Sequence, residues 1–336
     1  MDYIQPIQII GTQRSGSNLL RLMLNQFDEI SAPHPPHILQ RFMPLLPHYG
    51  NLEIPQNFFN LINDVSTLVE RNPVPWTKVQ FNREQLFNLC KKKNLVEIFR
   101  VIYDLKAKQD NSSFWACKSM ANITYAKEIE RSGMRPFYIH LYRDGRDVAC
   151  SFKKAIVGEK HVYHIANQWQ ENQEDCLGLR NKVGNERFIQ LSYENLINSP
   201  EEELKKISTF LNIEFKPKVF DFYMSEESHN TAIAGKMWAN VAKPILKGNS
   251  NKYKKELSEL EVGIFEKQAG KMLEKLTYKL EKTGIINGRE FTSTEIESFE
   301  TENKSLKEEA QISGDPEGIR LRKGQELLLT EIQLRG

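Results

Sequence analysis

Residues 9–24 read IIGTQRSGSNLLRLML, and this stretch predicts a strand, a tight loop and a helix in direct succession. The apolar run ends at Gly11, a second glycine follows five positions later, and the leucines after it are grouped at helical spacing. Such a loop aims successive backbone N–H groups, and the positive end of the following helix, at an anion. We therefore expect an anion-binding loop here. Its predicted contact residues are Gly11, Thr12, Gln13, Arg14, Ser15, Gly16, Ser17 and Asn18.

The loop departs from the ATP- and GTP-binding pattern G-x-x-x-x-G-K-[ST] at its charged position. Ser17 stands where that pattern has lysine, and Arg14 supplies a positive charge earlier in the loop. A guanidinium fork can hold a phosphate or a sulfate in place of both a lysine and a metal ion. An unspecialised tight turn between a strand and a helix is the alternative interpretation.

Composition and charge set the class of protein. The chain has 336 residues, of which 40% are hydrophobic and 27% charged, as in ordinary globular proteins. Its net charge of +2 favours neither nucleic acid nor a membrane surface as partner, so an anion site must be local. The chain shows no membrane-length apolar run and no signal pattern. Its four widely spaced cysteines are typical of reduced thiols, and we expect a cytoplasmic protein.

Three further strand–helix units follow the first, each with an apolar strand pattern and a helical pattern after it. The strands are expected in residues 112–119, 135–144 and 186–196, and the helices in residues 121–133, 145–155 and 199–213. Strands that alternate with helices predict an α/β fold, with a central parallel sheet flanked by helices.

The remaining segments are expected to be mostly helical. Amphipathic helices are predicted in residues 57–109, and residues 261–278 are expected to form the last helix of a main domain that spans 1–283. Residues 284–336 are polar and charge-rich, which predicts a helical or partly mobile C-terminal extension without an assigned function.

A second cluster of polar residues, LYRDGRDVACS, occupies residues 141–151. Arg143 leaves the predicted third strand at its carboxyl end, where ligands collect in open α/β sheets. Ser151 stands eight residues later, so both side chains could reach one phosphate. In the alternative interpretation, Arg143 only pairs with Asp144 or Asp147 on the surface.

Taken together, GTQRSGSNLL and YRDGRDVACS resemble, in this order, two motifs of the sulfotransferases that use 3′-phosphoadenosine 5′-phosphosulfate (PAPS). The resemblance covers roughly residues 5–280. It implies a P-loop-like fold in which the first motif holds the 5′-phosphosulfate. The R-x(7)-S element, here Arg143 and Ser151, would hold the 3′-phosphate. Because the loop has arginine where cytosolic members usually have lysine, it is more similar to the Golgi protein-tyrosine type and to bacterial members.

The resemblance also implies roles for residues outside these two motifs. Lys118 in FWACKSM matches a catalytic lysine at a strand end, and Tyr193 in LSYENL matches a tyrosine that contacts the nucleotide. The segment NVAKPILKGN resembles the basic segment that closes over the 3′-phosphate. There Lys243 is the preferred contact and Lys247 the second.

The general base is sought in SAPHPPH, residues 31–37, where the Golgi-type enzymes have a glutamate. His34 lies within one residue of that position and is the expected base, with His37 as the other candidate. Histidine is largely neutral near pH 7 and could take a proton from an acceptor. Both histidines could instead be polar residues in a rigid proline loop. His140, inside the predicted third strand, is expected to face the core or a neighbouring helix.

The expected function is transfer of a sulfuryl group from PAPS to a hydroxyl or amine, with the bisphosphate PAP as product and no metal. His34, Lys118 and Arg14 are the expected catalytic residues. The sequence does not identify the acceptor, which could be a small molecule, a carbohydrate, a lipid or a peptide. It does not predict the oligomeric state either. We expect no nucleic acid partner and no membrane span. Two alternatives are a P-loop kinase or nucleotide triphosphatase, and a non-catalytic nucleotide-binding protein of the same fold.

Overall fold

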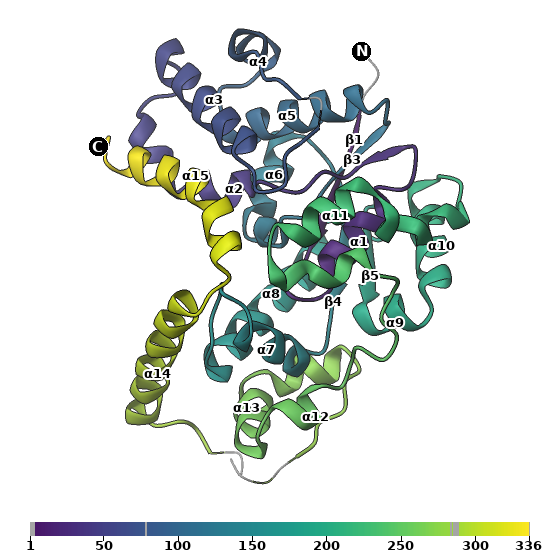
Figure 1. Ribbon diagram of the computed structural model, residues 1–336, viewed down its shortest axis with the longest axis vertical. Helices are drawn as coiled ribbons and strands as arrows, with labels where there is room; N and C mark the ends of the chain where they lie inside the picture. Colours follow the sequence, from purple (N-terminus) through teal and green to yellow (C-terminus); the bar gives the residue numbers. More distant parts are fainter. Residues whose placement is uncertain (1–3, 78, 283, 285–288, 336) are drawn as a thin grey trace.

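A five-stranded parallel sheet forms the centre of the molecule (Figure 1). The computed structural model describes residues 4–77, 79–282, 284 and 289–335. In spatial order β2-β3-β1-β4-β5, the strands are β2 (Ile30–Ser31), β3 (Phe114–Cys117), β1 (Gln5–Ile10), β4 (Phe137–Tyr142) and β5 (Phe188–Ser192). The predicted α/β class is therefore confirmed, and four strands lie where the sequence predicts them. The edge strand β2 was not predicted, because two residues are too few to produce a pattern.

Alternate side chains of the strands pack on opposite faces of the sheet, as parallel strands buried on both sides require. Ile7 and Ile9 of β1 join one hydrophobic cluster, whereas Ile10 joins another together with Tyr138 and Phe188. The first face is covered by α1 (Ser17–Leu24) and α10 (Pro200–Leu211), and the second by α5 (Leu95–Gln109) and α8 (Val162–Val183). His140 also lies on the second face, where its Nε2 is 2.8 Å from Oε1 of Gln173 on α8, as predicted.

The remaining helices before the C-terminal extension surround this core. The α-helices are α2 (Ile38–Phe42), α3 (Pro55–Glu70), α4 (Arg83–Leu89), α6 (Ala126–Ser132), α7 (Gly145–Lys153), α9 (Tyr193–Asn198), α11 (Glu226–Ile233), α12 (Tyr253–Glu256) and α13 (Glu259–Lys275). The 3₁₀ helices are η1 (Met43–Tyr49), η2 (Met120–Tyr125), η3 (Pro217–Met224) and η4 (Lys236–Ala242). The helices predicted in residues 57–109 and 261–278 are thus confirmed.

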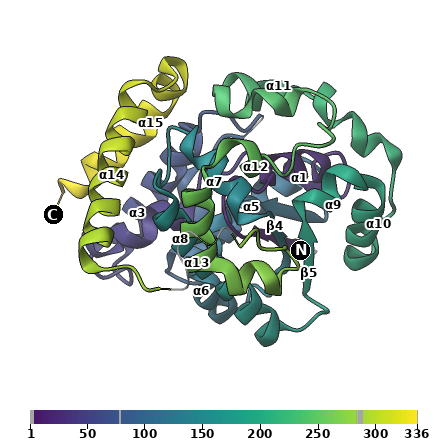
Figure 2. The same ribbon diagram turned by 90° about the horizontal axis from the view of Figure 1, so that it is seen from below.

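The C-terminal extension contains two long helices, α14 (Ser293–Ile312) and α15 (Pro316–Gln333), which run along one side of the molecule (Figures 1 and 2). The first of them packs beside the N-terminus of α8. Phe299 stacks on His161 with ring centroids 4.5 Å apart. The side-chain oxygen of Asn303 accepts the backbone N–H groups of Lys160 and His161 at 2.8 and 3.0 Å.

The second helix of the extension packs on a different part of the main domain. Leu328 and Ile332 of α15 are buried in the hydrophobic cluster that contains α3 and α5. Gln325 donates a hydrogen bond of 2.8 Å to the backbone carbonyl of Leu68, and Arg335 pairs with Asp64. The extension is thus helical, as predicted, and is anchored at two separate places. The domain boundary after residue 283 stays a prediction.

Because all strands of the sheet run in parallel, the segments after them meet at one edge. The chain leaves β2 toward His34 and His37, β3 toward Lys118, and β1 toward the glycine loop. It leaves β4 toward Arg143 and β5 toward Tyr193. Every predicted site residue up to Tyr193 therefore follows a strand of the sheet. Among the described residues, no helix is both long and apolar enough to cross a membrane.

Candidate active site

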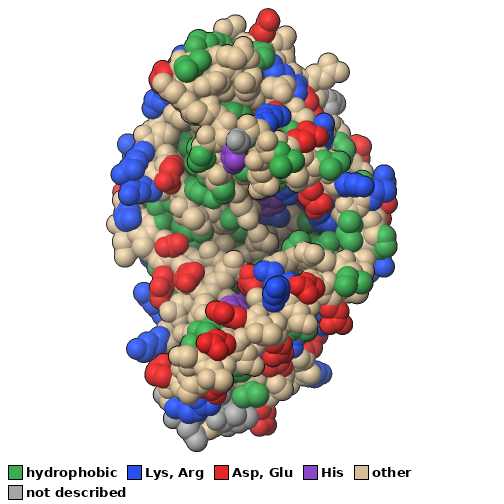
Figure 3. All heavy atoms as spheres, turned by 90° about the vertical axis from the view of Figure 1, so that its left-hand side faces the viewer, with side chains coloured by type: hydrophobic (Ala, Val, Ile, Leu, Met, Phe, Trp, Pro, Cys, Tyr) green, Lys and Arg blue, Asp and Glu red, His purple; other side chains and the backbone are tan. Residues whose placement is uncertain are grey.

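A cavity of about 1440 Å³ lies at the carboxyl edge of the sheet and brings the segments after the strands together. Its wall includes residues of the glycine loop, both histidines of the proline loop, Lys118, Arg143 and Tyr193. Figure 3 views the side on which α14 and α15 lie and shows a hollow in the middle of this face, with basic side chains inside it. The sequence motifs thus converge on one space.

The glycine loop has the backbone that its two glycines predict. Gly11 has φ 132°, and a Cβ there would lie 2.4 Å from the carbonyl oxygen of Leu141. Gly16 has φ 85°, and a Cβ there would lie 2.3 Å from the ring of Tyr193. Positive φ and close approach together exclude other residues at both positions. The loop is therefore held tightly between β4 and Tyr193, and α1 begins directly after it.

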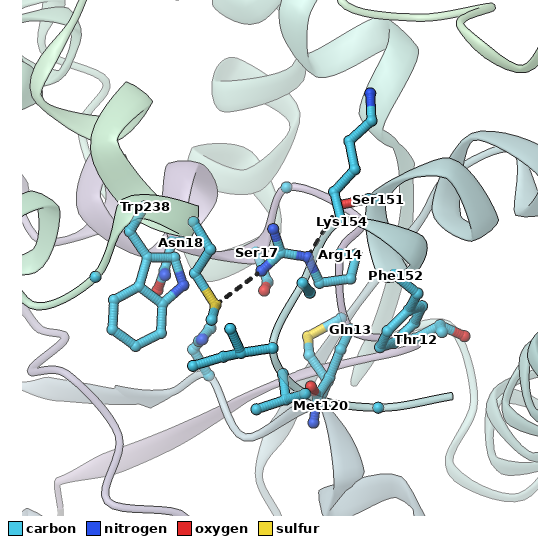
Figure 4. Close-up of a pocket in the computed structure, with 18 of the residues that line it drawn as sticks. Thr12, Gln13, Arg14, Ser17, Asn18, Met120, Ser151, Phe152, Lys154 and Trp238 are labelled. Atoms are coloured by element: carbon cyan, nitrogen blue, oxygen red, sulfur yellow. Dashed lines mark hydrogen bonds between the residues drawn. The ribbon is translucent and has the colours of Figure 1, made fainter. Parts of the chain in front are cut away.

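Arg14 joins the two motifs that the sequence analysis singled out (Figure 4). Its Nε donates a hydrogen bond of 3.0 Å to the hydroxyl of Ser151, and its Nη1 lies 3.5 Å from the sulfur of Met237. Burial, and then the charge of Arg143, lowers the pKa of Arg14 to about 10. The partners of this guanidinium group are neutral, so its charge is available to an anionic ligand.

Arg143 is fixed by contacts on several sides. Its guanidinium carbon lies 4.4 Å from the ring centroid of Tyr193, and its Nη2 donates to the carbonyl of Asn249 at 2.9 Å. Asp147 lies 3.3 Å from the same nitrogen, so the ion pair of the alternative interpretation exists, while Asp144 pairs with Arg146 instead. The buried Nε of Arg143 has no partner among the described residues. One donor thus stays available despite the ion pair.

The basic segment after η4 places one of its two predicted lysines at the cavity. Lys243 lines the cavity, whereas Lys247 is exposed and is not among the described residues that line it. Sequence reasoning missed Asn249, whose amide donates a hydrogen bond of 2.6 Å to the hydroxyl of Tyr193. It also missed Lys252, which lines the cavity.

The polar residues of the glycine loop point in different directions. Gln13, Ser17 and Asn18 line the cavity. Thr12 accepts a hydrogen bond of 3.1 Å from Gln173, which links it to the interior. The buried hydroxyl of Ser15 and the side-chain oxygen of Asn18 have no partner within the described part of the chain. The loop therefore keeps unsatisfied polar atoms close to the space where an anion would bind.

Lys118 is a buried cation at the end of β3, only 8% exposed. Burial first, and then the charges of Arg21 and Arg14, lowers its pKa to about 7. No residue that the structure describes forms a hydrogen bond or an ion pair with its amine. In the same ranges, no three His, Cys, Asp or Glu side chains are grouped as metal ligands, and metal-free chemistry stays a prediction.

His34 is held rigidly in the proline loop and is 3% exposed. Its carbonyl accepts hydrogen bonds from the amide of Asn72 at 3.0 Å and from the indole of Trp76 at 2.6 Å. The same amide lies 3.3 Å from Nδ1 of the ring. The two hydrogens of this amide reach the carbonyls of His34 and, at 2.8 Å, of Val74. A ring proton on Nδ1 would face this donor-only group, so the contact favours the tautomer with the proton on Nε2. Trp238 packs edge-on against this ring, with centroids 5.1 Å apart.

His37 has a different environment at the start of α2. Its Nδ1 lies 3.1 Å from the hydroxyl of Ser119, which can accept a proton from it and leave the lone pair on Nε2. Burial lowers the pKa of both histidines well below the ordinary value, with help from the charge of Arg21 at His34 and of Lys118 at His37. Both rings are therefore neutral near pH 7.

Arg21 is a residue of the site region that sequence reasoning missed. It is fully buried on α1 and donates to the carbonyl of Ala32 at 2.8 Å, to Glu227 at 2.7 Å and to Thr231 at 2.9 Å. These bonds fasten the proline loop to α1 and α11. An arginine within the apolar run NLLRLML was the available signal, because a buried charge requires dedicated partners.

Comparison with known proteins identifies a family that this chain matches and solved structures with a similar fold. Residues 6–217 match the model of a family described as "Sulfotransferase family". The sulfotransferase domain of the Synechococcus PCC 7002 olefin synthase superimposes with a TM-score of 0.57 and 19% identity, covering 83% of this chain and 97% of that one. A sulfotransferase domain from the curacin biosynthetic pathway gives a TM-score of 0.55 and 20% identity, covering 83% and 100%. No curated protein sequence matches significantly. At these identities the two structures show a shared fold.

Proposed function

Since this chain belongs to the sulfotransferase family, we propose that it moves a sulfuryl group from PAPS to a hydroxyl or amine of an acceptor. PAPS, when bound, supplies the activated sulfuryl group and a leaving phosphate. The observation that carries the proposal is the convergence of two arginines from separate motifs, Arg14 and Arg143, in one cavity. A ligand with phosphate groups at two positions of one nucleotide matches two such cations.

The residues present fit such a ligand. The hydroxyl of Ser15 and the Nε of Arg143 are buried donors without partners in the described ranges, and such donors are costly unless an acceptor of a ligand satisfies them. The loop amides and Arg14 would hold the 5′-phosphosulfate, and Arg143 with Ser151 the 3′-phosphate. Tyr193 would contact the nucleotide, and Lys243 would contact its 3′-phosphate. Lys247 remains the second candidate, because only Lys243 of the two lines the cavity within the described ranges.

Two cations are placed to stabilise developing negative charge. Arg14 lies in the glycine loop, and Lys118 is buried at the adjacent strand end, where no described residue forms an ion pair with it. Preorganised charges in a buried site stabilise a transition state more strongly than the same charges in water. We assign these residues the electrostatic role that a metal ion has in phosphoryl transfer.

His34 and His37 remain the two candidates for the base, and their hydrogen bonds differ. The contact with Asn72 favours the ring proton of His34 on Nε2, which suits a hydrogen-bond donor. The contact with Ser119 leaves Nε2 of His37 free to accept a proton. His34 is the residue that the sequence favours. The hydrogen bonds favour His37, and we propose His37 as the base and Ser119 as the residue that orients it.

Ligand binding separates this proposal from a nucleotide triphosphatase. PAP without metal should raise the melting temperature of the chain, whereas ATP with Mg²⁺ should not. The Arg143→Ala variant should lose the preference for PAP over adenosine 5′-monophosphate. Arg320→Ala serves as the matched surface control, because Arg320 is exposed on α15 and pairs with Glu317. Stabilisation by ATP with Mg²⁺ alone would contradict the proposal.

A second measurement distinguishes the proposed sulfotransferase activity from the function of a non-catalytic nucleotide-binding protein. The chain is incubated with ³⁵S-labelled PAPS and a cell extract, and labelled products are followed. Transfer that depends on Arg14 is the expected result. PAP binding without any transfer would favour the non-catalytic alternative.

A further inference from the structure

Helix α15 of the C-terminal extension forms part of the cavity wall, although it lies outside residues 6–217. Arg322 and Gln325 of α15 line the cavity, and Arg41 of α2 lines it as well. The N–H of Lys236 donates to the carboxylate of Asp315 at 3.0 Å, which joins the start of α15 to η4. The extension therefore contributes side chains to the space that the sheet edge opens.

The two arginines lie near the two histidines. The backbone N–H of Arg41, one turn along α2, donates to the carbonyl of His37 at 3.0 Å. Burial lowers the pKa of His37, and the charges of Lys118, Arg41 and Arg322 lower it further. Burial also lowers the pKa of Lys118, and the charges of Arg21 and Arg14 lower it further. Both arginines are thus among the charges that act on His37.

Arg322 is held close to the histidines through one aromatic ring. Its guanidinium carbon lies 5.1 Å from the ring centroid of Trp238, which in turn packs against His34. Its Nη1 donates to the carbonyl of Gly318 at 2.7 Å. Its Nη2 is buried and has no partner among the described residues. One donor of this fork therefore lacks an acceptor.

Arg41 has no hydrogen bond or ion pair from its side chain in the ranges that the structure describes. Burial lowers its pKa, and the carboxylate of Glu326 raises it. Burial lowers the pKa of Arg322, and the carboxylates of Glu326 and Asp315 raise it. Glu326 is exposed, and Asp315 accepts the N–H of Lys236. Glu309, at the rim, is exposed too. Within the described ranges, none of these carboxylates forms an ion pair with either arginine.

We propose that Arg41 and Arg322 bind an anionic group of the acceptor, a carboxylate or a phosphate, and so select hydroxyl compounds that carry one. This inference rests on the proposed function, since it assigns the acceptor end of the same cavity. Guanidinium forks bind carboxylates and phosphates with paired, charge-assisted hydrogen bonds. The acceptor hydroxyl then lies between its own anionic group and the glycine loop, next to His37.

The test uses chain saturated with PAP, so that the donor end is filled. Binding of 6,6,6-trifluorohexanoate, of 6,6,6-trifluorohexyl phosphate and of the neutral 6,6,6-trifluorohexanamide is measured by ¹⁹F NMR titration. The wild-type chain should bind at least one of the two anions at least ten-fold more tightly than the amide, and the two anions tell carboxylate from phosphate. Arg41→Gln and Arg322→Gln should each reduce this preference to about two-fold or less.

Arg320→Gln is the matched control, because Arg320 is exposed on the same helix and pairs with Glu317. It should keep the full preference. Equal binding of the anions and the amide by the wild-type chain, including undetectable binding of all three, would overturn the inference. So would a preference that survives in the Arg41→Gln/Arg322→Gln double variant.

Failure of the proposed function would look different. The affinity for PAP is measured first on each sample, and absence of PAP binding contradicts the proposed function directly. A chain that binds PAP but does not distinguish the anions from the amide contradicts only the assignment of the two arginines.

Discussion

The two ends of the cavity are built in contrasting ways. The end with Arg14, Arg143 and Tyr193, here called the donor half, follows the neighbouring strands β1, β4 and β5 and lies mostly within residues 6–217. The end with the two histidines, Arg41 and Arg322, here called the acceptor half, combines the edge-strand loop with η4 and the C-terminal extension. The donor half follows directly from neighbouring strands of the sheet, whereas the acceptor half needs segments from outside the sheet. The contrast teaches that one cavity can combine a part built by the sheet itself with a part built by the segments added around it.

The largest expected effect comes from removing the central charge of the donor half. Arg14→Ala should lower the rate of sulfuryl transfer about 10³-fold, because a preorganised cation at the reacting group is lost. The rate is measured with labelled PAPS and an acceptor found by screening. Arg14→Lys should retain part of the activity, since a point charge remains. Near-normal turnover in the alanine variant would remove Arg14 from the catalytic residues.

The next largest effect distinguishes the two histidines of the acceptor half. His37→Ala should reduce kcat about 10²-fold while leaving PAP affinity unchanged, because a general base contributes on this scale. His34→Ala should cost less, since the contact with Asn72 favours a donor rather than a base at its Nε2. Single-turnover rates and PAP titrations of both variants give the comparison. The reverse ranking would restore His34 as the base.

A smaller effect is the pH dependence of activity that Lys118, which lies between the two halves, should cause. The pKa of Lys118 is lowered to about 7, so its charged form is lost as pH rises through that value. The kcat/KM for PAPS should therefore decline between about pH 7 and pH 9. Lys118→Arg keeps the charge and should flatten this limb of the profile. If the wild-type profile stays level over this range, Lys118 does not act through its charge.

The smallest expected effect belongs to a contact in the donor half that the motifs do not reveal. Asn249→Ala should weaken PAP binding about three- to five-fold, since one hydrogen bond to Tyr193 is lost. Tyr193→Phe removes the same bond and should cost a similar amount. In calorimetric titrations the double variant should be no weaker than either single variant. Fully additive losses would show that the two residues act independently.

The fold and much of the donor half could be predicted from the sequence, because local patterns encode them. Each of these patterns lies within a short segment of the sequence. They are the glycine spacing, the hydrophobicity of the strands and the eight-residue interval from Arg143 to Ser151. The acceptor half depends on β2, which is too short to leave a pattern, and on Arg322, which lies far along the chain in a polar segment. Asn249 reaches Tyr193 across 56 positions. Such contacts arise only from packing, which no single window of sequence contains.

The two anchors of the extension also impose an order on folding. The donor half can assemble once the chain extends to Lys252, which already lines the cavity. The wall formed by α15 needs Leu328 and Ile332 in place against α3, and Arg335 meets Asp64 across 271 positions. Contacts between such distant residues form late, because the intervening chain must first be made and ordered. Under the proposed function, a nascent chain would complete the end that holds the nucleotide before the end that selects the acceptor.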